Sequence, residues 1–200
     1  NVALGGDGGD ESFFGYITFD AFSLAIKFKK FVPNFFLLLL KKIVNLKKIS
    51  NEYMSLSFRL NKFFNSLHLN NNYLLPSWMG CLNSSEMSIL FKEKINEEYM
   101  YASSNPIFND QTSLMKSSQL YYYKFYLPMI LSKIDQASMY NSVENRSPFL
   151  SKNVINFSLD TKIKENFNFF NNKNLVKKIF LKDIPKPLTK RKKHGFALPI

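Results

Sequence analysis

The sequence predicts an α/β fold in which one strand of a parallel sheet, at residues 1–4, is followed by a mostly helical remainder. The apolar run Val2-Ala3-Leu4 leads directly into a loop rich in glycines and carboxylates at residues 5–11. Beyond that loop, apolar residues recur at helical spacing through much of the chain. Ligands of open α/β sheets bind at the carboxyl ends of strands, so this loop is the first candidate site.

The loop combines backbone freedom with acidic side chains. Glycines at positions 5, 6, 8 and 9 let the backbone take positive φ and approach a ligand closely. Asp7, Asp10 and Glu11 can bind a cation or an amine. A solvated acidic turn has the same composition, but the position of this loop after an apolar strand favours a ligand site.

Length and cysteine content limit the class of protein. The 200 residues, 46% of them hydrophobic, predict one domain or most of one. The chain begins without Met inside an apparent strand and stops after an apolar run, so we expect a piece of a longer protein, with no secretory signal visible at its start. A single cysteine, Cys81, excludes an internal disulfide and a cysteine-based zinc cluster and favours a reducing cytoplasm.

The net charge of +12 is typical of proteins that bind polyanions. Only three of the basic residues are arginines, and Lys, Asn, Phe, Ile and Tyr share A/T-rich codons, so genome composition is a competing explanation. Residues 151–200 hold twelve Lys or Arg against three acidic residues, a local balance of +9. This segment fits either pyrophosphate chemistry or nucleic-acid binding.

Apolar spacing predicts a helix over residues 19–31 and another that begins at Pro33. A third helix is predicted over 52–69, and Asn70-Asn71-Asn72 would end it. The run at 35–40 lies between lysine pairs but is too short to span a membrane, which takes about 20 apolar residues. It predicts a buried helix or a lip that meets a partner domain. His68 lies at a helix end and is interpreted as a surface or capping histidine.

The middle of the chain offers fewer candidate functional residues. Residues 85–99 are helix-like, and 103–106 predict a loop. The aromatic run 121–126 resembles a base-stacking platform, but it continues into apolar 127–131, which favours helical core packing.

Residues 128–150 form the next informative segment. Helical spacing from Pro128 places Leu131, Asp135, Ser138 and Ser142 on one stripe, a mixture that is not typical of a core helix. Glu144 and Arg146 precede Pro148, where the helix must end, so both would project from a loop end. Structural ion pairing and ligand binding are both open for this pair.

Three motifs in order resemble the synthetase domain of glutamine-hydrolysing asparagine synthetases. They are the opening loop, the segment from D-Q-A-S-M at 135–139 to E-N-R-S-P-F-L at 144–150, and R-K-K-H-G-F-A-L-P-I at 191–200. The resemblance is thin between about residues 53 and 121. It implies an ATP-pyrophosphatase fold, of which this chain holds one or few parallel strands and mostly helices. The family's N-terminal glutaminase domain and first phosphate loop are not in this sequence, so the fragment alone is expected to be inactive.

The resemblance also implies a reaction. Family members adenylate the side-chain carboxylate of aspartate with ATP and Mg²⁺, release pyrophosphate, and amidate the intermediate with glutamine-derived ammonia. Asp10 matches the magnesium position and Asp7 the acidic position beside substrate and intermediate; Gly5 and Gly6 bring backbone amides to the nucleotide. Lys177 matches, by register, the lysine that stabilises phosphate charge, with Lys178 as the second choice.

Further expectations follow from the same match. Asp135, Glu144 and Arg146 would contact substrate, and Lys192, Lys193 and Gly195 would lie near the entrance. The resemblance implies a soluble, cytoplasmic ligase of amino-acid biosynthesis, with no membrane or nucleic-acid partner, and it allows a homodimer.

The chain also departs from the family pattern. Gly5 stands where serine is usual, Ser12 where leucine is usual, and Phe14 where glycine is usual. Gln136 replaces an arginine and Ser151 an aspartate, which leaves room for another carboxylate substrate. The alternatives are therefore a related amidotransferase, a basic nucleic-acid-binding module that uses residues 151–193, and a non-catalytic remnant that holds a partner domain.

Overall fold

The structure is a computed structural model that describes residues 1–45, 55–109, 113–169, 171–180, 183 and 185. The chain divides into two compact units. The first comprises Asn1–Asp20 and Asp110–Lys192, and the second comprises Ala21–Asn109 and Lys193–Ile200. Each unit is described by itself.

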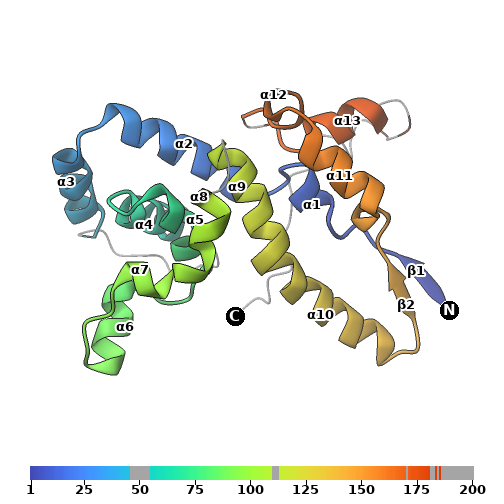
Figure 1. Cartoon of the computed structure of the whole chain (residues 1–200), viewed down its shortest axis with the longest axis horizontal. Helices are drawn as coiled ribbons and strands as arrows, with labels where there is room; N and C mark the ends of the chain where they lie inside the picture. Colours follow the sequence, from blue (N-terminus) through green and yellow to red (C-terminus); the bar gives the residue numbers. More distant parts are fainter. Residues whose placement is uncertain (46–54, 110–112, 170, 181–182, 184, 186–200) are drawn as a thin grey trace. The chain divides into compact units, whose positions relative to one another are not determined.

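A two-stranded parallel sheet forms the centre of the first unit. Strand β1 (Val2–Leu4) pairs with β2 (Glu144–Arg146) in the register Val2↔Glu144 and Leu4↔Arg146. Figure 1 shows the two strands side by side, with α1 (Gly9–Ser12) beyond the end of β1. β2 continues into η3 (Pro148–Leu150) and α11 (Lys152–Asp160). The expected strand at 1–4 is confirmed, whereas the prediction of a loop at Glu144 and Arg146 is wrong because these residues form the partner strand.

The aromatic run lies inside a nearly continuous helical rod. Helix α9 (Leu114–Tyr121) passes through η2 (Tyr122–Tyr126), a π-helical turn, into α10 (Leu127–Met139). Pro128 has no N–H to donate back along the helix, and the preceding amide of Leu127 donates to the carbonyl of Tyr122, five residues earlier. The local shift in hydrogen bonding produces the π turn.

The core of the first unit is aromatic. Phe13, Phe14, Phe19, Tyr121 and Tyr122 are buried, and the ring centroids of Phe19 and Tyr122 lie 4.7 Å apart. Core packing of the aromatic run is thus confirmed for Tyr121 and Tyr122. The unit is completed by α12 (Ile163–Asn166) and α13 (Asn174–Phe180).

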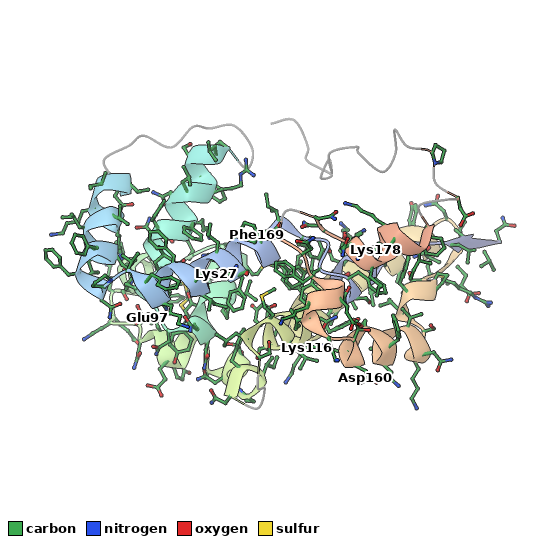
Figure 2. The ribbon with its side chains drawn as sticks, turned by 90° about the horizontal axis from the view of Figure 1, so that it is seen from above. Lys27, Glu97, Lys116, Asp160, Phe169 and Lys178 are labelled. Carbon is green, nitrogen blue, oxygen red and sulfur yellow. The ribbon has the colours of Figure 1, made fainter. Side chains whose placement is uncertain are left out.

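A lysine connects α9 to α11. Lys116, labelled in Figure 2 with Asp160 at the end of α11, donates to the carbonyls of Ser158, Leu159 and Thr161. These carbonyls belong to the end of α11, where helical partners are missing and a cation is favourable. The contact holds α11 against the rod.

The second unit is helical in its described part. Its helices are α2 (Ile17–Phe31, which starts in the first unit), α3 (Asn34–Asn45), α4 (Leu56–Ser66), α5 (Asn71–Met79), α6 (Ser84–Phe91), α7 (Glu97–Met100), η1 (Ala102–Ser104) and α8 (Asn105–Asn109). Helices at 19–31 and after Pro33 are confirmed, and α4 confirms the described part of the helix expected at 52–69. No helix in the part of the chain that the structure describes is long and apolar enough to cross a membrane.

Several sequence expectations for this unit are wrong in detail. Asn71 starts α5 instead of ending a helix, 103–106 is helical, and the stretch at 85–99 breaks at Lys92, whose φ is 54°. On α3, Leu37 is buried while Phe35 and Phe36 are exposed, so this is not a buried helix. His68 is an exposed residue next to the end of α4, as expected.

Candidate functional site

The glycine-carboxylate loop lies at the carboxyl ends of both strands. The amide of Gly5 donates to the carbonyl of Arg146 at 2.8 Å, which extends the parallel pairing by one residue. Gly8 has φ of 83°, and an added Cβ would lie 2.1 Å from Leu150 Cδ2, so a side chain does not fit there. An added Cβ at Gly6, in contrast, would have no heavy atom within 4 Å. The backbone at Gly6 is therefore open to a ligand.

The Asp7 carboxylate is held by the end of β2. Its Oδ2 accepts from Asn145 Nδ2 at 3.2 Å and from Ser147 Oγ at 3.1 Å. A Cβ on Gly5 would lie 2.6 Å from that Oδ2 and 2.8 Å from Asn145 Nδ2. The absence of a side chain at Gly5 gives Asp7 the space to turn toward β2.

Asp10 forms an ion pair with Lys173. Asp10 Oδ1 lies 2.6 Å from Lys173 Nζ, and the Asp10 side chain is 19% exposed. The amide of Lys173 donates to the carbonyl of Phe13 at 3.2 Å, so the residue before α13 is tied to the chain that follows α1. A Cβ on Gly15 would lie 1.9 Å from Asp10 Oδ1 and 2.6 Å from Lys173 Cε. Gly15 therefore leaves the space through which the pair forms.

Comparison with known families identifies the chain at this point. The family described as asparagine synthase matches residues 1–200. The chain belongs to the asparagine synthase family. No curated protein and no solved structure matched the chain. Membership indicates a ligase-type enzyme that amidates a carboxylate with ATP.

The lysine at the loop of this asparagine synthase domain is Lys173, which sequence reasoning missed. Lys177 lies one helical turn further along, where its Nζ donates to Asn171 Oδ1 at 3.3 Å. Lys178, labelled in Figure 2 on α13, is exposed. The available signal was the spacing of four residues between Lys173 and Lys177, about one helical turn, although Lys173 lies just before α13 and has φ of 57°. The structure separates them by placing Lys173 against Asp10.

Ser12 and Phe14, two residues that depart from the family pattern, both contact other side chains of the first unit. Ser12, in place of leucine, shares a hydrogen bond of 2.6 Å between its Oγ and Tyr123 OH. Phe14, in place of glycine, has φ of 52° and is only 1% exposed. Its ring centroid lies 4.9 Å from that of Phe19 and 5.6 Å from that of Phe167. The positive φ explains why glycine is usual there, and ring packing opposes the cost of the left-handed backbone.

The third carboxylate of the loop points inward. Glu11 is 2% exposed and accepts a hydrogen bond of 2.9 Å from Tyr16 OH. Burial, followed by the nearby Glu11 charge, raises the pKa of Tyr16 above its ordinary value. This pair supports the loop from its inner side.

The remaining predicted site residues lie at the surface. Arg146 Nε lies 2.8 Å from Glu144 Oε1, and the two side chains are 64% and 54% exposed. The hydrogen bond and charge of Arg146 lower the pKa of Glu144. Arg146 is level with Leu4 at the loop end of the sheet, and Glu144 is level with Val2 at the other end. Asp135 is exposed on α10, which leads into the amino end of β2, so the structure does not join it to the loop.

The described residues do not form a metal site by themselves. Among the described residues, no group of three or more His, Cys, Asp or Glu side chains could hold a metal ion. Mg²⁺ is usually held by one or two carboxylates together with substrate phosphates, so a loop that offers Asp10 fits a shared site. The expected entrance residues Lys192, Lys193 and Gly195 lie outside the described residues.

Proposed function

We propose that the protein containing this chain synthesises asparagine. It would adenylate the side-chain carboxylate of aspartate with ATP, release pyrophosphate and amidate the acyl-adenylate with ammonia from glutamine. The observation that carries the proposal is the open glycine backbone at the carboxyl ends of two parallel strands, with the Asp10–Lys173 pair beside it. We also propose that the domain has the ATP-pyrophosphatase fold, which places a nucleotide at that edge.

The residue roles follow from where each group lies. The backbone at Gly6 would contact the nucleotide, because an added Cβ there meets no heavy atom within 4 Å, whereas the Gly5 amide already donates to the carbonyl of Arg146. Asp10 would hold Mg²⁺ jointly with the phosphates, and the ion supplies neutralisation of phosphate charge. The Lys173 ammonium, 2.6 Å from Asp10, would then stabilise the negative charge that builds on the departing pyrophosphate. Lys173, rather than Lys177, would therefore have this role.

The aspartate substrate would contact Asp7 and Arg146. Both lie at the loop end of the sheet, where a carboxylate substrate can pair with the Arg146 guanidinium and its α-amino group with Asp7. Glu144, which already holds Arg146, would orient that guanidinium. Asp135 stays a prediction from the sequence, since it lies on α10 toward the amino end of β2.

The parts of the reaction that lie outside this chain are also proposals. Ammonia from glutamine requires a glutaminase domain elsewhere in the intact protein, and the first phosphate loop of the family is not in residues 1–200. We therefore expect residues 1–200 alone to be inactive, and we place the intact enzyme in the cytoplasm. A related amidotransferase with another acceptor is the second candidate. It is favoured by Gly5, which alters the surroundings of Asp7 at the proposed substrate position.

The test is pyrophosphate release by the intact protein. We expect release that depends on both ATP and aspartate, and an Asp10→Asn variant that loses it. Asp160→Asn is the matched control, because Asp160 is an exposed carboxylate at the end of α11. Release with another acid but not with aspartate would reject the acceptor and retain the reaction class. Absence of release with every carboxylate tried would reject the ligase itself.

A further inference from the structure

Helix α1, which carries Asp10, cannot set its own orientation. It has four residues, Gly9–Ser12, and a helix of about one turn has no independent stability in water. The Gly8 N-cap is left-handed and makes no side-chain capping hydrogen bond, and Phe14 beyond the helix is left-handed as well. The direction of α1 must therefore come from contacts with the rest of the first unit.

A chain of hydroxyl groups reaches α1 from behind. Ser12 is 0% exposed, and its Oγ lies 2.6 Å from Tyr123 OH, which lies 3.1 Å from Ser158 Oγ. Ser158 Oγ donates to the carbonyl of Ile155 at 2.9 Å. Ser158 thus donates its one hydroxyl proton to Ile155 and can only accept from Tyr123. Tyr123 OH therefore donates to Ser158, and Ser12 Oγ donates to Tyr123. Each hydroxyl in the chain then has a defined donor role.

The backbone of Ser12 is held at a second point. Its carbonyl accepts from Gln119 Nε2 at 2.8 Å and from Asn166 Nδ2 at 2.9 Å. Both amide side chains are buried, so water does not compete for these bonds. Side chain and carbonyl together pin the last residue of α1 to α9, the π turn and α12.

The position of Ser12 relative to Asp10 gives this anchoring a consequence at the site. Two residues apart on a helix correspond to a rotation of about 200°, so the two side chains lie on nearly opposite sides of the turn. Ser12 faces Tyr123 inside the unit, and Asp10 faces Lys173. A rotation of α1 that follows the loss of the inner anchor therefore moves the Asp10 carboxylate.

We propose that Tyr123 is a positioning residue that, through Ser12, sets the orientation of α1 and so places the Asp10 carboxylate for a metal-bound nucleotide. The inference rests on the proposed function, and it gives a role at the site to a residue of the aromatic run, for which the sequence predicts core packing. The π turn is what carries Tyr123 between two helices. Such turns occur frequently at functional sites.

The test uses the intact protein and two readouts, the Kd of magnesium-ATP by calorimetry and the Tm. Tyr123→Phe removes one oxygen and leaves the ring, and we expect a lower Tm together with magnesium-ATP binding weakened about ten- to one-hundred-fold, the range for groups that orient metal ligands. Ser12→Ala removes the bond between Ser12 and Tyr123, while Tyr123 keeps its bond to Ser158. It should therefore weaken magnesium-ATP binding about as much as Tyr123→Phe does, with a smaller effect on Tm. Tyr140→Phe is the control, since Tyr140 is 91% exposed in the same unit.

The double variant Ser12→Ala/Tyr123→Phe separates positioning from stability. It removes both partners, so no buried hydroxyl is left without its bond, and we expect the Tm to recover relative to Tyr123→Phe. A positioning role predicts that magnesium-ATP binding stays weak in the double variant. Binding that recovers with the Tm, or that is unchanged in Tyr123→Phe and Ser12→Ala, would overturn the inference and leave the proposed function standing. Failure of the unaltered protein to bind magnesium-ATP would instead overturn the proposed function, and the inference with it.

Discussion

At position 14, a glycine substitution should give a more stable protein than an alanine substitution. In a helix the order of stability is the reverse. The Phe14 φ of 52° costs an L-residue roughly 1–2 kcal/mol, and its ring is 1% exposed between Phe19 and Phe167. Phe14→Ala keeps the backbone cost and loses the ring, a change of about 3–5 kcal/mol for a buried phenylalanine. Phe14→Gly loses the same ring but relieves the backbone, at an entropic cost of about 0.5–1 kcal/mol in the unfolded chain. The glycine variant should therefore be the more stable by about 0.5–1 kcal/mol.

Phe19 is the matched control. It is buried in α2 and packs on Phe14, but it has a helical backbone, where glycine is less stable than alanine by about 0.8–1 kcal/mol. Urea unfolding of the four variants measures both differences, with the slope m checked for each. The order of Gly and Ala should differ between the two positions. A Phe14→Gly protein that is less stable than Phe14→Ala by as much as in the Phe19 pair would refute the explanation of this departure by positive φ.

Two further predictions concern the ion pair and alkaline stability. Lys173→Ala should lower pyrophosphate release by about 10²–10³-fold, the usual loss for one group that stabilises developing negative charge, while Lys177→Ala stays near normal. The Asp10–Lys173 pair is partly exposed, so we expect Lys173→Ala to change unfolding free energy by less than about 1 kcal/mol. Equal losses of pyrophosphate release in both variants would return the role to α13 as a whole. Because the pKa of Tyr16 is raised in the folded state, its contribution to stability is complete below about pH 10 and falls as the pH rises further. Tyr16→Phe should flatten the loss of unfolding free energy above that pH in titrated urea unfolding, and an unchanged slope would contradict the burial of the Tyr16–Glu11 pair.

Local signals predicted β1 but not its partner. Val2-Ala3-Leu4 is apolar and runs into glycines, which is enough to indicate a strand end. β2 is Glu144-Asn145-Arg146, three polar residues with no alternation of apolar side chains, and its pairing depends on hydrogen bonds to residues more than 130 positions away. A strand this short is defined by its neighbour, so pattern analysis had no basis for it.

The candidate site shows the same limit. Asp7 and Asp10 were found because the loop that carries them is contiguous and rich in glycine. Lys173 was missed because a lysine before a helix is indistinguishable in sequence from Lys177 one turn later. The two are separated by the folded position of Gly15, which leaves space for Lys173 to reach Asp10. Family register pointed to Lys177 on α13, and only the contact with Asp10 singles out Lys173, the residue before that helix.

Two of the departures from the family pattern, Gly5 and Ser12, have a common physical consequence. At Gly5, the loss of a side chain gives Asp7 room to bond to Asn145 and Ser147; at Ser12, a hydroxyl replaces an apolar group and meets Tyr123. At both positions the new residue creates or accommodates a polar contact inside the first unit. A remnant that only holds a partner domain has no physical need for a carboxylate and an ammonium in contact beside an open glycine backbone. The Asp10–Lys173 ion pair, together with the polar contacts at Gly5 and Ser12, therefore favours a working loop over a remnant that only holds a partner domain.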